Sequence, residues 1–146
     1  YTISLSAEAD SVVEAWLKQR IREFNNRYST HHLSARTAGV EPLHVLVRTP
    51  EGELLGGLTA STYWQWLDIN DLWLPPALRG QGLGHKLLTL AEAEARRRGC
   101  TRAQLQTFDF QARDFYEKVG YRVVGVLEDY PPDGAMYWMR KELVAS

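Results

Sequence analysis

The sequence predicts an α/β domain built around one mixed central sheet of six to seven strands, flanked by helices. Two observations lead to this prediction. Segments with the two-residue apolar period of strands alternate along the chain with segments of helical period. Glycines and prolines gather between these segments, where turns are expected. With 146 residues, the chain has the length of a single domain, residues 1–146.

The first forty residues predict a short strand and one amphipathic helix. Residues 2–5 alternate and are expected to form a first strand. Residues 8–25 follow a helical period, and the apolar residues that share one face are Val12, Val13, Trp16, Leu17, Ile21 and Phe24. Residues 26–40 are polar, which predicts a loop or a weak helix.

The rest of the chain predicts most of the sheet. Residues 43–49 and 54–64 are rich in strand formers and flank a Pro-Glu-Gly-Glu turn, which predicts a hairpin. A third strand, 66–74, is stopped by two prolines. A strong helix is expected over 82–98, with Gly99 placed to end it in the left-handed conformation. The remaining elements are a strand at 103–107, a short helix at 111–119, and strands at 121–127 and 136–143.

Composition and charge exclude several classes of partner. The formal net charge is −1, from 17 basic and 18 acidic residues, so binding to nucleic acid is not expected. No apolar run approaches the roughly 20 residues of a membrane span. The single cysteine, Cys100, cannot form an internal disulfide, which favours a cytoplasmic location. No cluster of ligands has metal-site spacing, so no metal is expected. A homodimer is left open.

The most informative stretch is Arg79-Gly80-Gln81-Gly82-Leu83-Gly84, between a predicted strand and a predicted helix. Glycines let the backbone approach a ligand closely, and a helix N-terminus offers free N–H groups, so the stretch suits a phosphate or pyrophosphate. The alternative is an ordinary strand-to-helix turn. A Walker A loop is excluded because Gly84 is followed by His85 and Lys86. His85 also occupies the sixth position of a dinucleotide fingerprint, where that motif needs glycine.

Arg79, Gly82 and Gly84 have the spacing of Arg/Gln-x-x-Gly-x-Gly/Ala, which resembles the pyrophosphate loop of the GNAT superfamily of acyl-CoA-dependent N-acetyltransferases. A second stretch, from Ala112 to Tyr121, resembles the other signature of that family, a helix that carries a tyrosine and ends in Gly-aromatic. The two stretches lie about thirty residues apart, with a helix and a strand between them. The resemblance covers residues 42–143.

The resemblance implies a GNAT-like fold and transfer of an acetyl group from acetyl-CoA to a primary amine. In that family the amine attacks directly within a ternary complex, without an acyl-enzyme. The acceptor is either a small molecule or a protein amine. The positions that match the cofactor-binding segments of the family are Leu72, Trp73, Leu74, Arg79, Gly80, Gln81, Gly82, Leu83, Gly84 and His85.

Two side chains match catalytic positions of the family. Tyr116 aligns with the general acid that protonates the CoA sulfur, and its alternative role is a core aromatic. Asp68 lies four residues before Leu72, where the family often places a carboxylate base, and its alternative role is a solvated strand residue. Regular strand alternation would place Asp68 on the same face as Leu72 and Asp71 on the opposite face. A backbone N–H of Leu72–Leu74 would polarise the thioester carbonyl.

Two other functions remain open from the sequence. One is a non-catalytic acyl-CoA-binding or sensing module that keeps the glycine loop. The other is a binding domain for a different phosphate ligand, with the loop as a simple anion nest. Release of free thiol from acetyl-CoA in the presence of an amine would distinguish the enzyme from both.

Overall fold

The computed structural model describes residues 1–144, with the side chains of all of these except 35–38. Its contacts divide the chain into two compact units, Tyr1–Gly39 and a second unit that begins at Val40. That residues 1–146 form one domain therefore stays a prediction.

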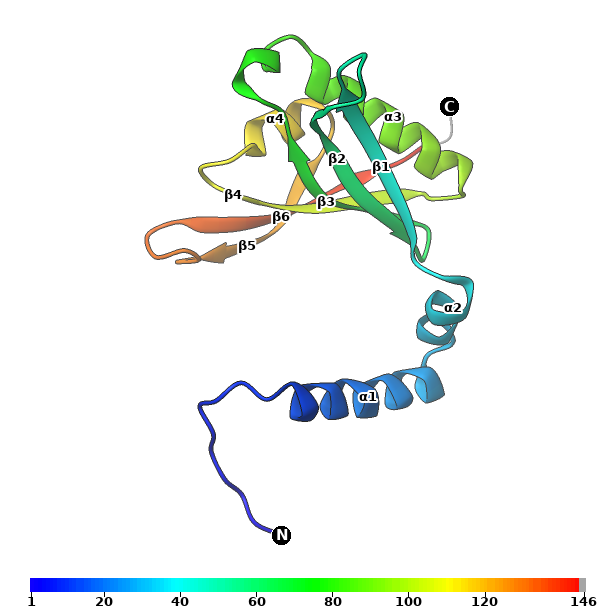
Figure 1. Ribbon diagram of the computed structural model, residues 1–146, viewed down its shortest axis with the longest axis vertical. Coiled ribbons are helices and arrows are strands. Elements are labelled where there is room, and N and C mark those ends of the chain that lie inside the picture. The colour runs from blue at the N-terminus through cyan, green and yellow to red at the C-terminus, as the bar shows by residue number, and fades with distance from the viewer. Residues whose placement is uncertain (145–146) are drawn as a thin grey trace. The chain divides into compact units, whose positions relative to one another are not determined.

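The first unit contains two helices, α1 (Ser11–Tyr28) and α2 (Thr30–Ala38) (Figure 1). Helix α1 begins at Ser11 because the Asp10 side chain accepts hydrogen bonds from the next backbone N–H groups and caps the helix. It continues past residue 25, where the rings of Phe24 and Tyr28 contact each other one turn apart in a tilted arrangement, with centroids separated by 4.7 Å. Most of residues 26–40 is therefore helical.

The predicted strand at residues 2–5 is wrong. This segment has no regular secondary structure. A strand needs a neighbour to pair its N–H and C=O groups, and no described strand pairs with this segment. In the first unit, none of the described side chains of α1 is buried, although the predicted apolar face is present in the sequence.

The second unit holds a six-stranded sheet with the strand order β1-β2-β3-β4-β6-β5. β3 and β4 run parallel, and the other neighbouring strands are antiparallel. The predicted mixed α/β fold is thus confirmed. The strands are β1 (Glu41–Arg48), β2 (Leu54–Tyr63), β3 (Trp66–Trp73), β4 (Arg102–Phe108), β5 (Arg122–Glu128) and β6 (Ala135–Glu142).

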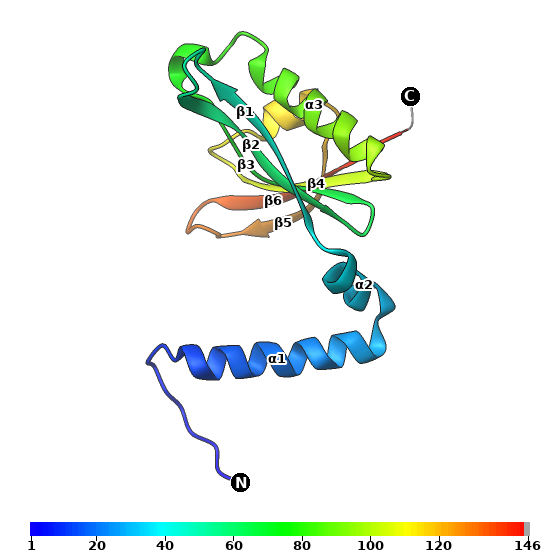
Figure 2. The same cartoon turned by 45° about the vertical axis from the view of Figure 1, so that its right-hand side comes forward.

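Helices α3 (Leu83–Arg97) and α4 (Arg113–Lys118) contribute to one core with the sheet, and a 3-10 turn, η1 (Pro76–Leu78), precedes α3 (Figure 2). One apolar face of α3 is buried in this core: Leu88, Ala91 and Ala95 are at most 1% exposed. Burial of such a face stabilises a helix far more than its intrinsic propensity does. The packed helix holds the glycine loop, which precedes it, at one end of the sheet.

Two irregularities in β3 determine where a ligand can enter. β3 pairs with β4 only over Trp66–Asp68, and the two strands separate beyond that point. In addition, Asn70 is an extra residue, because the partners of Thr59 and Ala60 on β2 are Asp71 and Ile69.

This bulge at Asn70 reverses the alternation of β3. Ile69 and Leu72 both face the core, although they are three positions apart and regular alternation would place them on opposite faces. The prediction that Asp68 and Leu72 share a face is therefore wrong, because it assumed a regular strand. Asp68 and Asp71 lie on the side of the sheet away from the core.

Candidate active site

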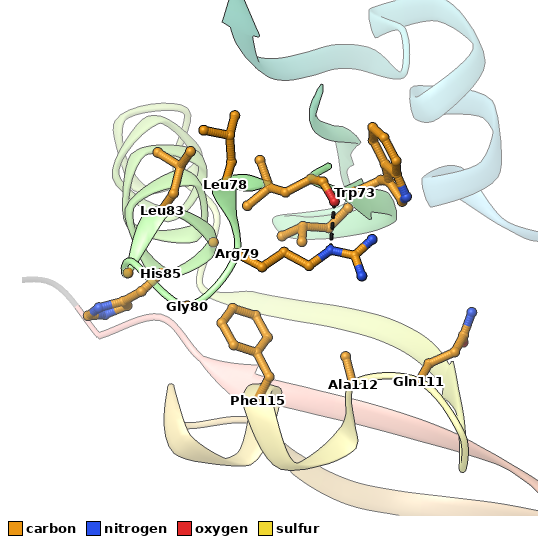
Figure 3. A pocket seen from close by; sticks show the side chains of 13 residues that line it. Trp73, Leu78, Arg79, Gly80, Leu83, His85, Gln111, Ala112 and Phe115 are labelled. Atoms are coloured by element: carbon orange, nitrogen blue, oxygen red, sulfur yellow. Dashed lines mark hydrogen bonds between the residues drawn. The ribbon is translucent and has the colours of Figure 1, made fainter. Parts of the chain in front are cut away.

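A cavity of about 480 Å³ opens where β3 leaves β4, and we call it the cofactor cleft (Figure 3). The end of β3, the loop from η1 to α3, and the start of α4 form its walls. Nine of the predicted cofactor-binding residues line it: Leu72, Trp73, Leu74, Arg79, Gly80, Gly82, Leu83, Gly84 and His85. The structure thus brings together two segments that the sequence predicted separately.

The glycine loop has the conformation that an anion site requires. Gly80 and Gly82 have φ values of 74° and 77°, in the left-handed region that favours glycine. No atom lies within 4 Å of a Cβ built at either position, so backbone conformation and not crowding requires glycine there. Gly82 also caps α3 without a side-chain hydrogen bond, and the first turn of α3 holds no acidic residue. The N–H groups at this helix end are left for an anionic ligand.

Arg79 joins the loop to the strand. Its Nε donates a hydrogen bond of 2.7 Å to the carbonyl oxygen of Leu74, and its guanidinium lies 6.0 Å from the ring centroid of Trp73 (Figure 3). This contact holds the glycine loop against the end of β3 and adds a positive charge to the cleft. Gln81 lies apart from the cleft: its amide donates to the carbonyl of Ala77.

The edge of β3 that faces the cleft has no strand beside it from Leu72 to Trp73, because pairing with β4 ends at Asp68. The opposite edge pairs with β2 over the same residues. An unpaired strand edge presents N–H and C=O groups to which an extended, amide-containing ligand can bind as an added strand. The apolar side chains of Leu72 and Leu74 complete this wall.

Tyr116 lies behind the cleft wall. It is 7% exposed, and its ring meets those of Phe115 and Tyr121 edge to face, at centroid distances of 5.2 and 5.8 Å. Burial, and next the charge of Asp71, raise the pKa of Tyr116 to about 12. This burial and ring packing are what we expect if Tyr116 is an aromatic residue of the core, the alternative to the acid role. The raised pKa keeps the hydroxyl protonated at neutral pH, as a general acid requires.

Asp68 lies outside the cofactor cleft. It lines a second cavity, which is polar and lies on the other side of the point where β3 and β4 separate. The Tyr63 hydroxyl donates to its Oδ2 over 3.0 Å. Burial, followed by the charge of Asp68 and this hydrogen bond, raises the pKa of Tyr63, so this phenol stays a donor. The candidate acid and the candidate base thus occupy different sides of the same opening in the sheet.

Four residues of the cleft were not predicted as site residues: Leu78, Gln111, Ala112 and Phe115. The last three lie in or next to the second family-like stretch, so their position after β4 was a usable signal. Phe115 has a further role, because a Cβ on Gly84 would lie 3.2 Å from its ring. The absence of a side chain at Gly84 thus leaves room for the Phe115 ring against the first turn of α3. For Leu78 the sequence holds no comparable signal.

The described side chains contain no group of three or more His, Cys, Asp or Glu residues that could hold a metal ion. Within the described part of the chain, no helix has the length and apolar character to cross a membrane. Cys100 is buried, and this burial raises the pKa of its thiol, which makes it an unreactive core residue.

Comparisons with known proteins agree with this geometry. A sequence model of the acetyltransferase (GNAT) family matches residues 9–121. The blasticidin-S acetyltransferase of Streptomyces morookaense is 47% identical over 93 residues, which are 63% of this chain and 68% of that protein. An acetyltransferase of Agrobacterium fabrum is 36% identical over 68% of this chain and 72% of its own. A crystal structure of a Bacillus cereus acetyltransferase superposes with a TM-score of 0.83, at 29% identity, over 95% of this chain and 97% of its own.

Proposed function

Since the chain belongs to the acetyltransferase (GNAT) family, we propose that it transfers an acetyl group from acetyl-CoA to a primary amine of a small molecule. The observation that carries this proposal is the cofactor cleft. A helix N-terminus without a side-chain hydrogen bond at its cap and a left-handed glycine loop lie beside an unpaired strand edge, so one opening offers sites for a pyrophosphate and for an amide-bearing arm.

The residues of the cleft fit acetyl-CoA. The backbone of Gly80–Gly84 and the start of α3 would hold the pyrophosphate, with Arg79 adding positive charge. The edge of β3 at Leu72–Leu74 would pair with the pantetheine arm, and a backbone N–H there would stabilise the oxyanion that forms during acyl transfer. When bound, acetyl-CoA supplies the acetyl thioester.

In this proposal Tyr116 is the general acid. Its hydroxyl gives a proton to the departing sulfur, and its pKa of about 12 ensures that the proton is present at neutral pH. The Tyr116 ring packs edge to face against Phe115, a residue of the cleft wall, which places Tyr116 next to the cleft.

We propose Asp68 as the general base. The reason is its position beside the strand separation, since Asp68 and Leu72 lie on different faces of the sheet. Its carboxylate lies beside the strand separation, on the side opposite to the cofactor cleft. A lysine-type amine is mostly protonated at pH 7, with a reference pKa of about 10.4, so it must lose a proton before it attacks. Asp68 would accept that proton through a water molecule.

A small-molecule acceptor is supported by the similarity to the Streptomyces morookaense protein, which is an acetyltransferase for blasticidin S. The direct test is to incubate the purified chain with acetyl-CoA and a panel of primary amines that includes blasticidin S, and to measure release of free thiol together with the mass of the product. We expect thiol release that depends on the amine and a mass gain of one acetyl group. Tight acetyl-CoA binding without amine-dependent release would instead support a non-catalytic binding module.

The cellular location and the oligomeric state of the protein are also part of this proposal. A cytoplasmic location is supported by the single buried cysteine, which takes part in no internal disulfide. A homodimer stays a prediction, and light scattering of the purified chain tests it.

A further inference from the structure

A second cavity, of about 360 Å³, lies in the sheet beside the point where β3 and β4 separate, and we call it the polar chamber. Side chains from β2, β3, β4 and β6 line it, and it shares no lining residue with the cofactor cleft. A role for this chamber in binding the acceptor rests on the proposed acetyl transfer.

The polar side chains of the lining come from the face of the sheet away from the core, and the core residues Ile69 and Leu105 also line the chamber. Asp68 is the cross-strand partner of Gln104, and Gln106 is the partner of Trp138. Their sequence neighbours Leu67, Leu105 and Met139 are buried in the core. Regular alternation in β4 and β6 therefore directs the polar residues and the indole to the same side, and the bulge at Asn70 adds one more amide.

The chamber holds one carboxylate in a fixed position. The Tyr63 hydroxyl donates to Asp68 over 3.0 Å, which leaves further acceptor sites on the carboxylate. No basic residue is among the described residues that line the chamber. Two arginines on this face, Arg102 and Arg140, lie over the ring of Trp66 and pair with the carboxylate of Glu142. Asp68 is thus available to an ammonium group.

The remaining polar lining consists of uncharged hydrogen-bonding groups and one flat ring: the amides of Asn70, Gln104 and Gln106, and the indole of Trp138. A lysine side chain would bring four methylenes to these amides and satisfy none of them. Asn70 and Gln106 are exposed in the free protein and Gln104 is half-buried, so a bound ligand would cover amides that now contact water. An amide that loses its hydrogen bonds with water without a replacement destabilises the complex. A ligand with a planar amide-like or heteroaromatic part would satisfy them.

We propose that the polar chamber is the acceptor site and that its acceptor is a small amine with a planar, hydrogen-bonding body. The ammonium end lies at Asp68, and the planar part lies against Trp138 within reach of Gln104 and Gln106. The lining thus selects against the lysine of a protein substrate, which offers only an alkyl stem at this depth.

Two amines of the same size test the proposal: 4-(aminomethyl)benzamide, which has the planar polar group, and 4-methylbenzylamine, which lacks it. We expect the parent enzyme to acetylate the benzamide with the higher kcat/KM. Gln106→Leu should lower kcat/KM about tenfold for the benzamide, as expected for one lost hydrogen bond, and less than twofold for the methyl compound. Equal effects on the two amines, or no effect on either, would overturn the assignment.

A binding measurement separates this proposal from the proposed activity. Benzamide, which has no alkyl amine, is titrated into the CoA-loaded protein while the indole N–H resonance of Trp138 is followed by NMR, assigned by its loss in Trp138→Phe. We expect this resonance to shift, and the shift to weaken in Gln106→Leu. If the resonance shifts while no amine is acetylated, the chamber binds its ligand and the proposed activity fails. If acetylation proceeds and the resonance does not move, the acceptor lies elsewhere and the inference is wrong.

Discussion

The cofactor cleft and the polar chamber lie on two sides of one strand separation, and they are built in different ways. In the cleft, the groups available for recognition belong mainly to the backbone: two glycines with positive φ, the free N–H groups of α3, and an unpaired edge of β3. In the chamber, they belong to side chains: a carboxylate, three amides and an indole.

This difference indicates which parts of the site tolerate substitution. A backbone site depends on conformation, so most side-chain changes leave it intact and only changes at the glycines disturb it. A side-chain site changes its ligand preference with a single substitution. We therefore expect variants of the two regions to change different quantities. Variants of the cleft alter CoA affinity, and variants of the chamber alter selection of the acceptor.

The largest effect is expected at Tyr116, which packs against Phe115 in the wall of the cofactor cleft. Tyr116→Phe removes the proton donor and keeps the ring, so kcat should fall about a hundredfold, while the dissociation constant of CoA stays within twofold. Because the pKa of Tyr116 is raised to about 12, the hydroxyl loses its proton only at very alkaline pH, and the parent rate should not decline up to about pH 10 on this account. Steady-state kinetics and calorimetry measure both quantities.

The control for Tyr116 is its neighbour Tyr121, whose hydroxyl donates to the buried carboxylate of Glu92 over 3.1 Å. Tyr121→Phe disturbs the same core, and it should lower stability by about 1 kcal/mol while kcat changes less than threefold. An equal loss of kcat in both variants would assign Tyr116 to core packing alone.

The next effect concerns the backbone of the cleft. Gly82→Val places a β-branched residue at φ 77°, which disfavours this conformation and displaces the N–H groups at the start of α3. We expect CoA affinity to fall about thirtyfold, or about 2 kcal/mol, the scale of one or two charge-assisted hydrogen bonds. Calorimetry measures the affinity. The Michaelis constant of the acceptor, measured at saturating acetyl-CoA, should change little.

Gly52→Val is a matched control for this variant. Gly52 also has a positive φ, 92°, with no atom within 4 Å of a built Cβ, and it lies in the turn between β1 and β2. The control carries a comparable conformational strain away from the cleft. Unchanged CoA affinity in a folded Gly82→Val variant, or an equal loss of CoA affinity in Gly52→Val, would show that the loop does not bind the pyrophosphate.

On the side of the chamber, Asp68→Asn should lower kcat/KM for the amine about tenfold at pH 7 and leave CoA affinity unchanged. If Asp68 is the base, the loss is concentrated below the pKa of the amine and disappears above it, where the amine is already neutral. A pH series of kcat/KM measures this, with Glu51→Gln in the β1–β2 turn as a control that removes one negative charge elsewhere. A loss of the same size at every pH would exclude the base role and leave Asp68 as a binding group.

The contrast between the two regions also explains why the cofactor cleft could be predicted from the sequence and the polar chamber could not. The cleft was predictable because a backbone conformation that needs glycine appears in the sequence as glycine at fixed spacing, as at Gly80 and Gly82. Nine of ten predicted cofactor residues line the cleft, and they follow from this glycine spacing together with the resemblance of the preceding strand to the family. The mixed sheet was predictable because strand and helix periods are local properties of the chain.

The chamber could not be read from the sequence in the same way. Tyr63, Asp68, Gln104 and Trp138 come from four strands and meet only through the register of the folded sheet. The bulge at Asn70 has no specific mark in the sequence, because asparagine is disfavoured throughout strands and does not by itself locate a bulge. One extra residue there reversed the face predicted for Asp68 relative to Leu72.

The smallest effect is expected at Gly84, where the packing of two helices forms part of the cleft. Gly84 has no positive φ, and a Cβ there would lie 3.2 Å from the ring of Phe115. Alanine is a better helix former than glycine, and the Phe115 ring can move into the open cleft, so Gly84→Ala should raise the free energy of unfolding by about 0.5 kcal/mol. The displaced ring narrows the cleft, and CoA affinity should fall about twofold. Urea unfolding and calorimetry measure the two changes. A loss of stability would mean that Phe115 is held rigidly, and a larger loss of affinity would mean that its ring contacts the cofactor directly.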